Sequence, residues 1–149
     1  MKPAPGNRRR RGNAALEFAL TWAACSVMFT GIFQYGWSMF VYNSLITNVT
    51  NAAQYGAISN FSSDDPTTFS TRIKNMAVYG NPSGGTTPLV YGLSTSNVSV
   101  DTNLMGGFPT RVTVSITGFS VNAVFGTQTF NGKPRVTMEY VGFTCVSGC

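Results

Sequence analysis

This chain of 149 residues has room for a single domain. Its formal net charge of +5 lies in residues 1–12, which hold five of the ten bases. The other five bases are matched by five acids, so the charge argues for a basic tag and against a nucleic-acid-binding face. The sequence has no histidine, the commonest general base and metal ligand, and no glycine-rich phosphate loop. We therefore expect no enzyme activity, no metal, no cofactor and no nucleic-acid partner.

The first predicted element is a basic segment followed by a membrane helix. Residues 1–12 end in the run Arg8, Arg9, Arg10 and Arg11, and no charge occurs in the 25 residues from Phe18 to Tyr42. A bilayer core needs about 20 mainly apolar residues in a helix, so residues 13–42 are predicted to span a membrane. Because basic flanks stay in the cytoplasm, the N-terminus is expected inside and the chain after the helix outside.

The helix is predicted to continue outside the membrane over residues 43–60. No proline occurs between Pro5 and Pro66, so nothing forces the helix to end at the membrane surface. A helical period places small and apolar residues on one face, with polar residues largely opposite. The first group is Leu45, Val49, Ala52, Ala53 and Gly56, and the second is Thr47, Asn51 and Gln54. We expect the small-residue face to pack against a soluble domain formed by residues 61–149.

The soluble domain is predicted to start with a short helix and to continue as strands. Asp65 and Pro66 are typical of a helix start, and Gly80 is typical of its end. Apolar residues then alternate with polar ones in three runs, which predicts a small antiparallel sheet with one buried face. The runs are Val98 and Val100; Val112, Val114 and Ile116; Val136, Met138 and Tyr140. Asn131-Gly132 predicts a hairpin between the runs around Phe130 and Val136. The predicted fold class is therefore α+β.

Glu17 is the most informative single residue. A carboxylate near the centre of a membrane helix costs roughly 2.5 kcal/mol or more, though less near an end, so it needs a partner or a purpose. A cut after Gly12 gives Asn13 a free amine four residues before Glu17. Positions i and i+4 share a helix face, so that amine and the Glu17 carboxylate can pair.

The segment RRRRGNAALEFAL (Arg8–Leu20) resembles the processing site of TadE-type pseudopilins of the Tad/Flp (type IVc) pilus system. In type IV pilins and their relatives, a prepilin peptidase cleaves after a glycine, and a glutamate follows at the fifth mature position. Gly12 and Glu17 match that spacing. The segment NSLITNVTNAAQYGA (Asn43–Ala57) is also similar to the family's post-membrane helix, with its AA-x-x-GA arrangement. The resemblance covers about residues 8–57, and one departure is the lack of proline in the apolar segment.

The resemblance implies a pilin-like fold and a minor pseudopilin, cleaved between Gly12 and Asn13, that supports pilus biogenesis, secretion and adhesion. The implied partners are the prepilin peptidase, a major Flp-type pilin, a partner pseudopilin, the inner-membrane assembly platform and membrane lipid. The implied location is the bacterial inner membrane, with the N-terminus cytoplasmic and residues 61–149 periplasmic. Incorporation into the pilus is a further expectation.

Three other interpretations compete with a cleaved pseudopilin. A secretory signal peptide is disfavoured by Glu17 and by the length of the apolar segment. A lipoprotein is disfavoured because Trp22 stands before Ala23-Ala24-Cys25 where Leu is expected, and the chain stays apolar well beyond Cys25. An uncleaved membrane anchor, acting as a periplasmic binding or adhesive protein, is the main alternative, because the arginine run alone fits both.

Four polar residues of the apolar segment are spaced by four: Ser26, Thr30, Gln34 and Ser38. Such a stripe is typical of a close helix–helix contact in lipid, here between subunits. The alternative is that the hydroxyl groups bond to the carbonyl four residues earlier. Both interpretations stay open on the sequence.

Cys145 and Cys149 close the sequence as CVSGC. An oxidising periplasm permits a disulfide within one subunit if a turn at Ser147-Gly148 brings the two residues together. The alternative is a thiol that pairs with another subunit.

Overall fold

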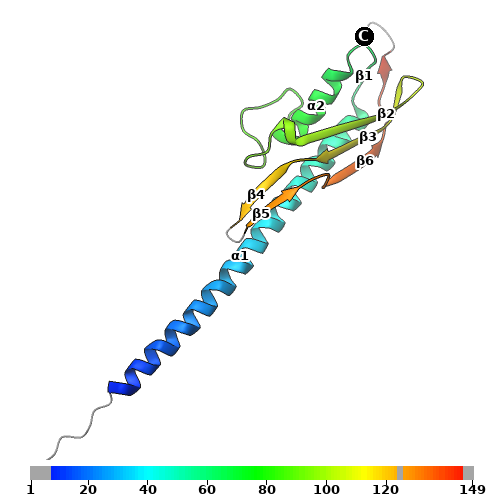
Figure 1. The fold of residues 1–149 in the computed structure, drawn as a ribbon. Coiled ribbons are helices and arrows are strands. Elements are labelled where there is room, and N and C mark those ends of the chain that lie inside the picture. The colour runs from blue at the N-terminus through cyan, green and yellow to red at the C-terminus, as the bar shows by residue number, and fades with distance from the viewer. Residues whose placement is uncertain (1–7, 124–125, 146–149) are drawn as a thin grey trace, which may run out of the picture. The chain divides into compact units, whose positions relative to one another are not determined.

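The computed structural model describes residues 8–123 and 126–145, and for residues 8–12, 123 and 145 it describes the backbone only. The fold is α+β with a long N-terminal helix (Figure 1). Its elements are α1 (Arg8–Ile58), β1 (Phe61–Ser62), α2 (Pro66–Tyr79), the short helix η1 (Thr95–Asn97), β2 (Val98–Met105), β3 (Phe108–Ile116), β4 (Phe119–Ala123), β5 (Gly126–Phe130), β6 (Arg135–Glu139) and β7 (Thr144–Cys145). The chain forms two compact units, Met1–Trp37 and Ser38–Cys149.

Helix α1 starts earlier than the sequence predicts, at Arg8 rather than near Asn13. Arginine is a good helix former, and a single glycine at position 12 costs only about 1 kcal/mol relative to alanine. The helix ends at Ile58, close to the predicted end at residue 60.

The second half of α1 buries its small-residue face, as predicted. All five residues of that face are buried, whereas Thr47, Asn51 and Gln54 are exposed. The contact is closest at Gly56, where an added Cβ would lie 2.8 Å from Ile73 Cδ1 of α2 and 3.1 Å from Val112 Cγ1 of β3. The glycine therefore lets α1 approach both α2 and the sheet.

The ends of α2 confirm the predicted caps. Asp65 accepts a hydrogen bond from the Thr68 main-chain N–H at 3.0 Å, and Pro66 occupies the first turn. Gly80 follows the last residue with a φ of 70°, a left-handed conformation that glycine adopts without strain. Phe69, Ile73, Ala77 and Val78 form the buried face of the helix.

The main sheet is antiparallel with the strand order β2-β3-β6. Val100 pairs with Val114 and Val114 with Val136, so the three predicted runs lie side by side. The central strand is the most deeply buried, because Val112, Val114 and Ile116 have no exposed surface. Thr113 and Ser115 on its other face are also mostly buried, and the Thr113 hydroxyl lies 3.0 Å from that of Thr137.

The predicted hairpin at Asn131-Gly132 is wrong. Strand β5 pairs with β4 in a separate two-stranded sheet, and β6 pairs with β3. The Gly132 N–H donates to the Ile116 carbonyl at 2.8 Å, and the Ile116 N–H donates to the Pro134 carbonyl at 3.1 Å. Asn131 and Gly132 therefore connect the β4–β5 sheet to the main sheet. The main-chain groups of Ile116, at the end of β3, take the place of the hydrogen bonds that a β5–β6 hairpin would form.

A short parallel pair, β1 with β7, adds to the predicted antiparallel strands. Next to it, the Phe61 N–H donates to the Phe143 carbonyl at 3.0 Å, and the Val141 N–H donates to the Ala57 carbonyl at 2.9 Å. The last strand thus joins the region where α1 ends.

Candidate processing and membrane segment

The predicted cleavage site lies inside the first turns of α1. Gly12 and Asn13 are both helical, and the side chains of Asn13 and Glu17 are exposed. Glu17 follows Asn13 by four residues on a continuous helix, so the two share one face. Among residues 13–122 and 126–144, whose side chains the structure describes, none forms an ion pair with Glu17. Its carboxylate is therefore available to a charged group from elsewhere.

The basic leader is described only in part. Residues 1–7 lie outside the described residues, and Arg8, Arg9, Arg10 and Arg11 are described as helical backbone without their side chains. Their predicted role in orienting the chain stays a prediction.

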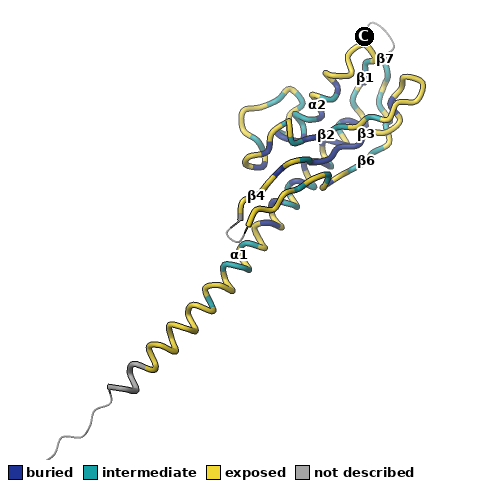
Figure 2. Tube along the Cα trace, viewed as in Figure 1, coloured by how far each residue is buried: buried dark blue, intermediate teal, exposed yellow. Residues whose placement is uncertain are grey.

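The first half of α1 exposes apolar side chains all round its axis. Leu16 and Leu20 share one face of the helix, and Phe18 lies nearly opposite them, because successive residues turn by about 100°. All three side chains are 65–69% exposed. Figure 2 shows this part of α1 mostly in yellow. Further exposed members are Trp22, Val27, Met28, Phe29, Ile32, Phe33 and Tyr35. Such a surface is costly in water and suits lipid or other helices.

The helix meets the requirements of a membrane span by length and composition. In the part of the chain that the structure describes, one helix, Asn13–Ile58, is long and apolar enough to cross a membrane. Helix α1 is therefore a candidate membrane anchor.

The four polar residues spaced along α1 differ in their surroundings. The Ser26 hydroxyl donates to the Trp22 carbonyl and the Thr30 hydroxyl to the Ser26 carbonyl, both at 2.8 Å. This is the local bonding that the sequence leaves as an alternative. Ser38, by contrast, is mostly buried in the second unit, and Gln34 is half-buried. A helix–helix contact through this stripe stays a prediction, because hydroxyl groups that bond locally still permit close packing.

The cysteine prediction is not tested. Cys149 lies outside the described residues, and Cys145 is described only as backbone in β7. Cys25 is a free, half-buried thiol in α1.

A pocket of about 380 Å³ lies between β1 and α2, lined by Asn60, Phe61, Ser62, Asp65, Thr68, Phe69 and Arg72. Hydrogen bonds from the side chains of Thr68 and Thr67 lower the pKa of Asp65 to about 2, so this carboxylate is already used by the helix cap. Among the described residues, no group of three or more Cys, Asp and Glu side chains lies close enough to hold a metal ion.

No family model matches the sequence, and no curated protein or solved structure matches it. The family resemblance of residues 8–57 therefore stays a prediction that rests on the sequence.

Proposed function

We propose that this chain is a TadE-like minor pseudopilin of a Tad-type pilus system. A prepilin peptidase cuts the precursor after Gly12, and α1 anchors the mature subunit in the bacterial inner membrane with its domain in the periplasm. The observation that carries the proposal is the spacing of Gly12 and Glu17 at the head of a helix that is apolar all round.

Cleavage requires local unwinding of α1, because the Gly12–Asn13 bond lies within its first turns. The end of a helix opens at little free-energy cost, since its first four N–H groups have no intrahelical partner. Glycine at position 12 lowers that cost further. After the cut, the new amine of Asn13 pairs with the carboxylate of Glu17, either in its own subunit or in a neighbour.

The two halves of α1 support different contacts in this proposal. The second half uses its small-residue face within its own domain, at Ala52, Ala53 and Gly56. The first half, up to Trp37, keeps its apolar surface for lipid, for the major pilin, for a partner pseudopilin and for the assembly platform. Insertion follows from that surface and does not need Glu17.

Substitution of Glu17 separates insertion from assembly. We expect Glu17→Ala and Glu17→Gln to be inserted and cleaved like the wild type and to fail to support pili, because neither side chain carries the negative charge that the proposed pairing with the amine requires. Glu139→Gln is the matched control, since Glu139 is an exposed acid that makes only a 3.9 Å surface ion pair with Arg111. Fractionation and pilus counts provide the readout. Normal piliation with both Glu17 variants would refute the pairing role.

The second candidate function is an uncleaved, membrane-anchored binding or adhesive protein. The helix that continues unbroken through Gly12 favours this alternative, because cleavage requires α1 to unwind locally and an uncleaved anchor does not. The two proposals differ in the N-terminal residue of the protein in the cell.

A further inference from the structure

The β2–β3 hairpin ends in a tip of exposed apolar residues. Leu104, Met105 and Phe108 are 55%, 76% and 44% exposed, and Gly106 and Gly107 form the turn between them. Both glycines have positive φ, 63° and 86°, and an added Cβ on either would meet no atom within 4 Å. Figure 2 shows this loop in yellow at the end of the hairpin. The tip is therefore a protrusion and not the wall of a pocket.

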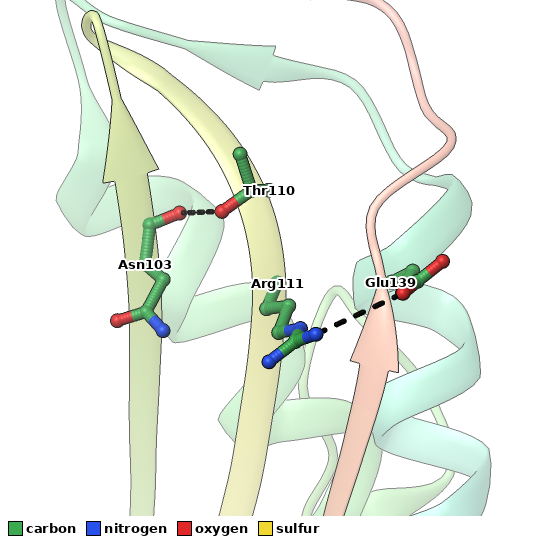
Figure 3. A network of polar contacts seen from close by, with 4 residues as sticks. All are labelled: Asn103, Thr110, Arg111 and Glu139. Atoms are coloured by element: carbon green, nitrogen blue, oxygen red, sulfur yellow. Dashed lines mark hydrogen bonds and ion pairs between the residues drawn. The ribbon is translucent and has the colours of Figure 1, made fainter.

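The base of the hairpin holds this tip in place. The register shifts between Asn103 and Leu104, so that Thr110 is an extra residue in β3. The Thr110 hydroxyl donates to the Asn103 carbonyl at 3.1 Å, and Arg111 pairs with Glu139 on the neighbouring strand (Figure 3). The Tyr140 N–H also donates to the Thr110 carbonyl at 3.0 Å. The bulge is thus bonded on both sides, which fixes the direction of the tip.

The apolar side chains lie on both faces of the ribbon. Met105 pairs with Phe108, and Leu104 pairs with Pro109, which is buried. Because neighbouring residues of a strand point to opposite faces, Met105 and Phe108 are exposed on one face and Leu104 on the other. A flat protein partner would cover one face only. Residues 102–110 carry no charge, so they offer no ion pair by which a partner could be recognised. Lipid can surround both faces, and this chain already carries a candidate membrane anchor.

We propose that residues 104–108 insert into a lipid surface. Only the tip enters, because the unpaired backbone groups along the strand edges must keep water as their partner. This proposal does not depend on cleavage after Gly12.

The test uses the full chain, reconstituted through α1 into vesicles and checked by protease accessibility for outward-facing domains. Protein-free acceptor vesicles of phosphatidylethanolamine and phosphatidylglycerol are added, and their capture is measured. We expect capture by the wild type and a loss of about a hundredfold for Met105→Ser with Phe108→Ser, since each buried apolar side chain contributes about tenfold. Tyr91→Ser is the matched control, because Tyr91 is 97% exposed outside the tip.

A second variant guards against a folding defect in the first. We expect Met105→Trp to strengthen capture and its fluorescence to be quenched when only the acceptor vesicles contain brominated lipid. The absence of capture by the wild type, equal capture by the double variant, or no quenching would overturn the proposal. Capture that occurs only when the acceptor vesicles also carry the protein would overturn it in favour of a contact between two copies of the chain.

Discussion

The hydroxyl of Tyr140 lies 2.8 Å from the carbonyl oxygen of Ser59, to which it donates a hydrogen bond across 81 residues of sequence. The Tyr140 hydroxyl oxygen accepts a hydrogen bond from the Phe61 N–H at 3.1 Å. It also lies 2.8 Å from the Phe143 carbonyl oxygen, which is an alternative acceptor for the one hydroxyl proton. Burial raises the pKa of the Tyr140 hydroxyl above its usual value, which keeps it protonated and able to donate. One side chain thus joins the region after α1 to the last strand.

Tyr140→Phe should lower the free energy of unfolding by about 1 kcal/mol, because the Ser59 carbonyl loses its donor, whereas the Phe61 N–H keeps its hydrogen bond to the Phe143 carbonyl. The ring contact with Phe69, at a centroid distance of 6.4 Å, is retained. Chemical denaturation of the protein in detergent micelles measures the change. Tyr91→Phe, which alters an exposed hydroxyl, should stay within about 0.5 kcal/mol. Equal effects of the two substitutions would contradict the role of Tyr140.

Gly56→Leu should destabilise the domain by about 1–3 kcal/mol or more, because the new side chain meets Ile73 and Val112 at the closest approach of α1. Ile73→Ala in the same chain should recover part of the loss, since it removes the atoms that collide. Gly36→Leu is the control, because an added Cβ there meets no atom within 4 Å. Thermal unfolding of these three variants and of Ile73→Ala alone provides the comparison, and purely additive effects at positions 56 and 73 would contradict the contact.

Asn48→Leu should raise the free energy of unfolding by about 1–3 kcal/mol. Asn48 is 8% exposed, and its side-chain Nδ2 has no hydrogen-bond partner. A buried donor without a partner carries its full desolvation cost, whereas leucine has a similar size and no polar atom. Asn51→Leu, on the exposed side of the same helix, is the control. A loss of stability in Asn48→Leu would indicate that the amide has a partner that water supplies.

The cap of α2 predicts an acid dependence of stability. The folded-state pKa of Asp65 is lowered to about 2 from an ordinary value of 3.8, so its contribution is present above about pH 3.8 and lost as the pH falls through about 2. Asp65→Asn keeps a capping oxygen but does not titrate, so it should remove this part of the acid-induced loss. The loss of helix content with falling pH is measured by circular dichroism. An acid-induced loss in Asp65→Asn equal to that of the wild type would contradict the stabilisation of α2 by the ionised Asp65 side chain.

Local signals in the sequence predict much of this fold. The caps at Asp65 and Gly80, the buried face of α1 and the three alternating runs each depend on residues close together in the chain, and each lies where the pattern places it. The wrong hairpin at Asn131-Gly132 has a different origin. A glycine turn indicates that the chain turns, but the partner of each flanking strand is decided by distant residues, here by Ile116.

The contacts around Tyr140 and the β1–β7 pair have no local signal at all. Both join residues near position 60 to residues near position 143, and a two-residue parallel pair leaves no periodicity to detect. The processing site is the reverse case. It is predicted from the arginine run, Gly12, Glu17 and the apolar segment that follows, and the structure adds that the bond between Gly12 and Asn13 lies in a helix.

The N-terminal residue of the protein recovered from cell membranes tests the central claim most directly. Mass spectrometry of the wild type should show a chain that starts at Asn13, and Gly12→Ile should keep the leader, because a bulky residue does not fit a peptidase site that accepts glycine. Gly31→Ile, at a glycine of the same helix where an added Cβ meets no atom within 4 Å, should be processed normally. A wild-type protein that starts at Met1 or Lys2 in piliated cells would contradict the proposal and favour the uncleaved anchor.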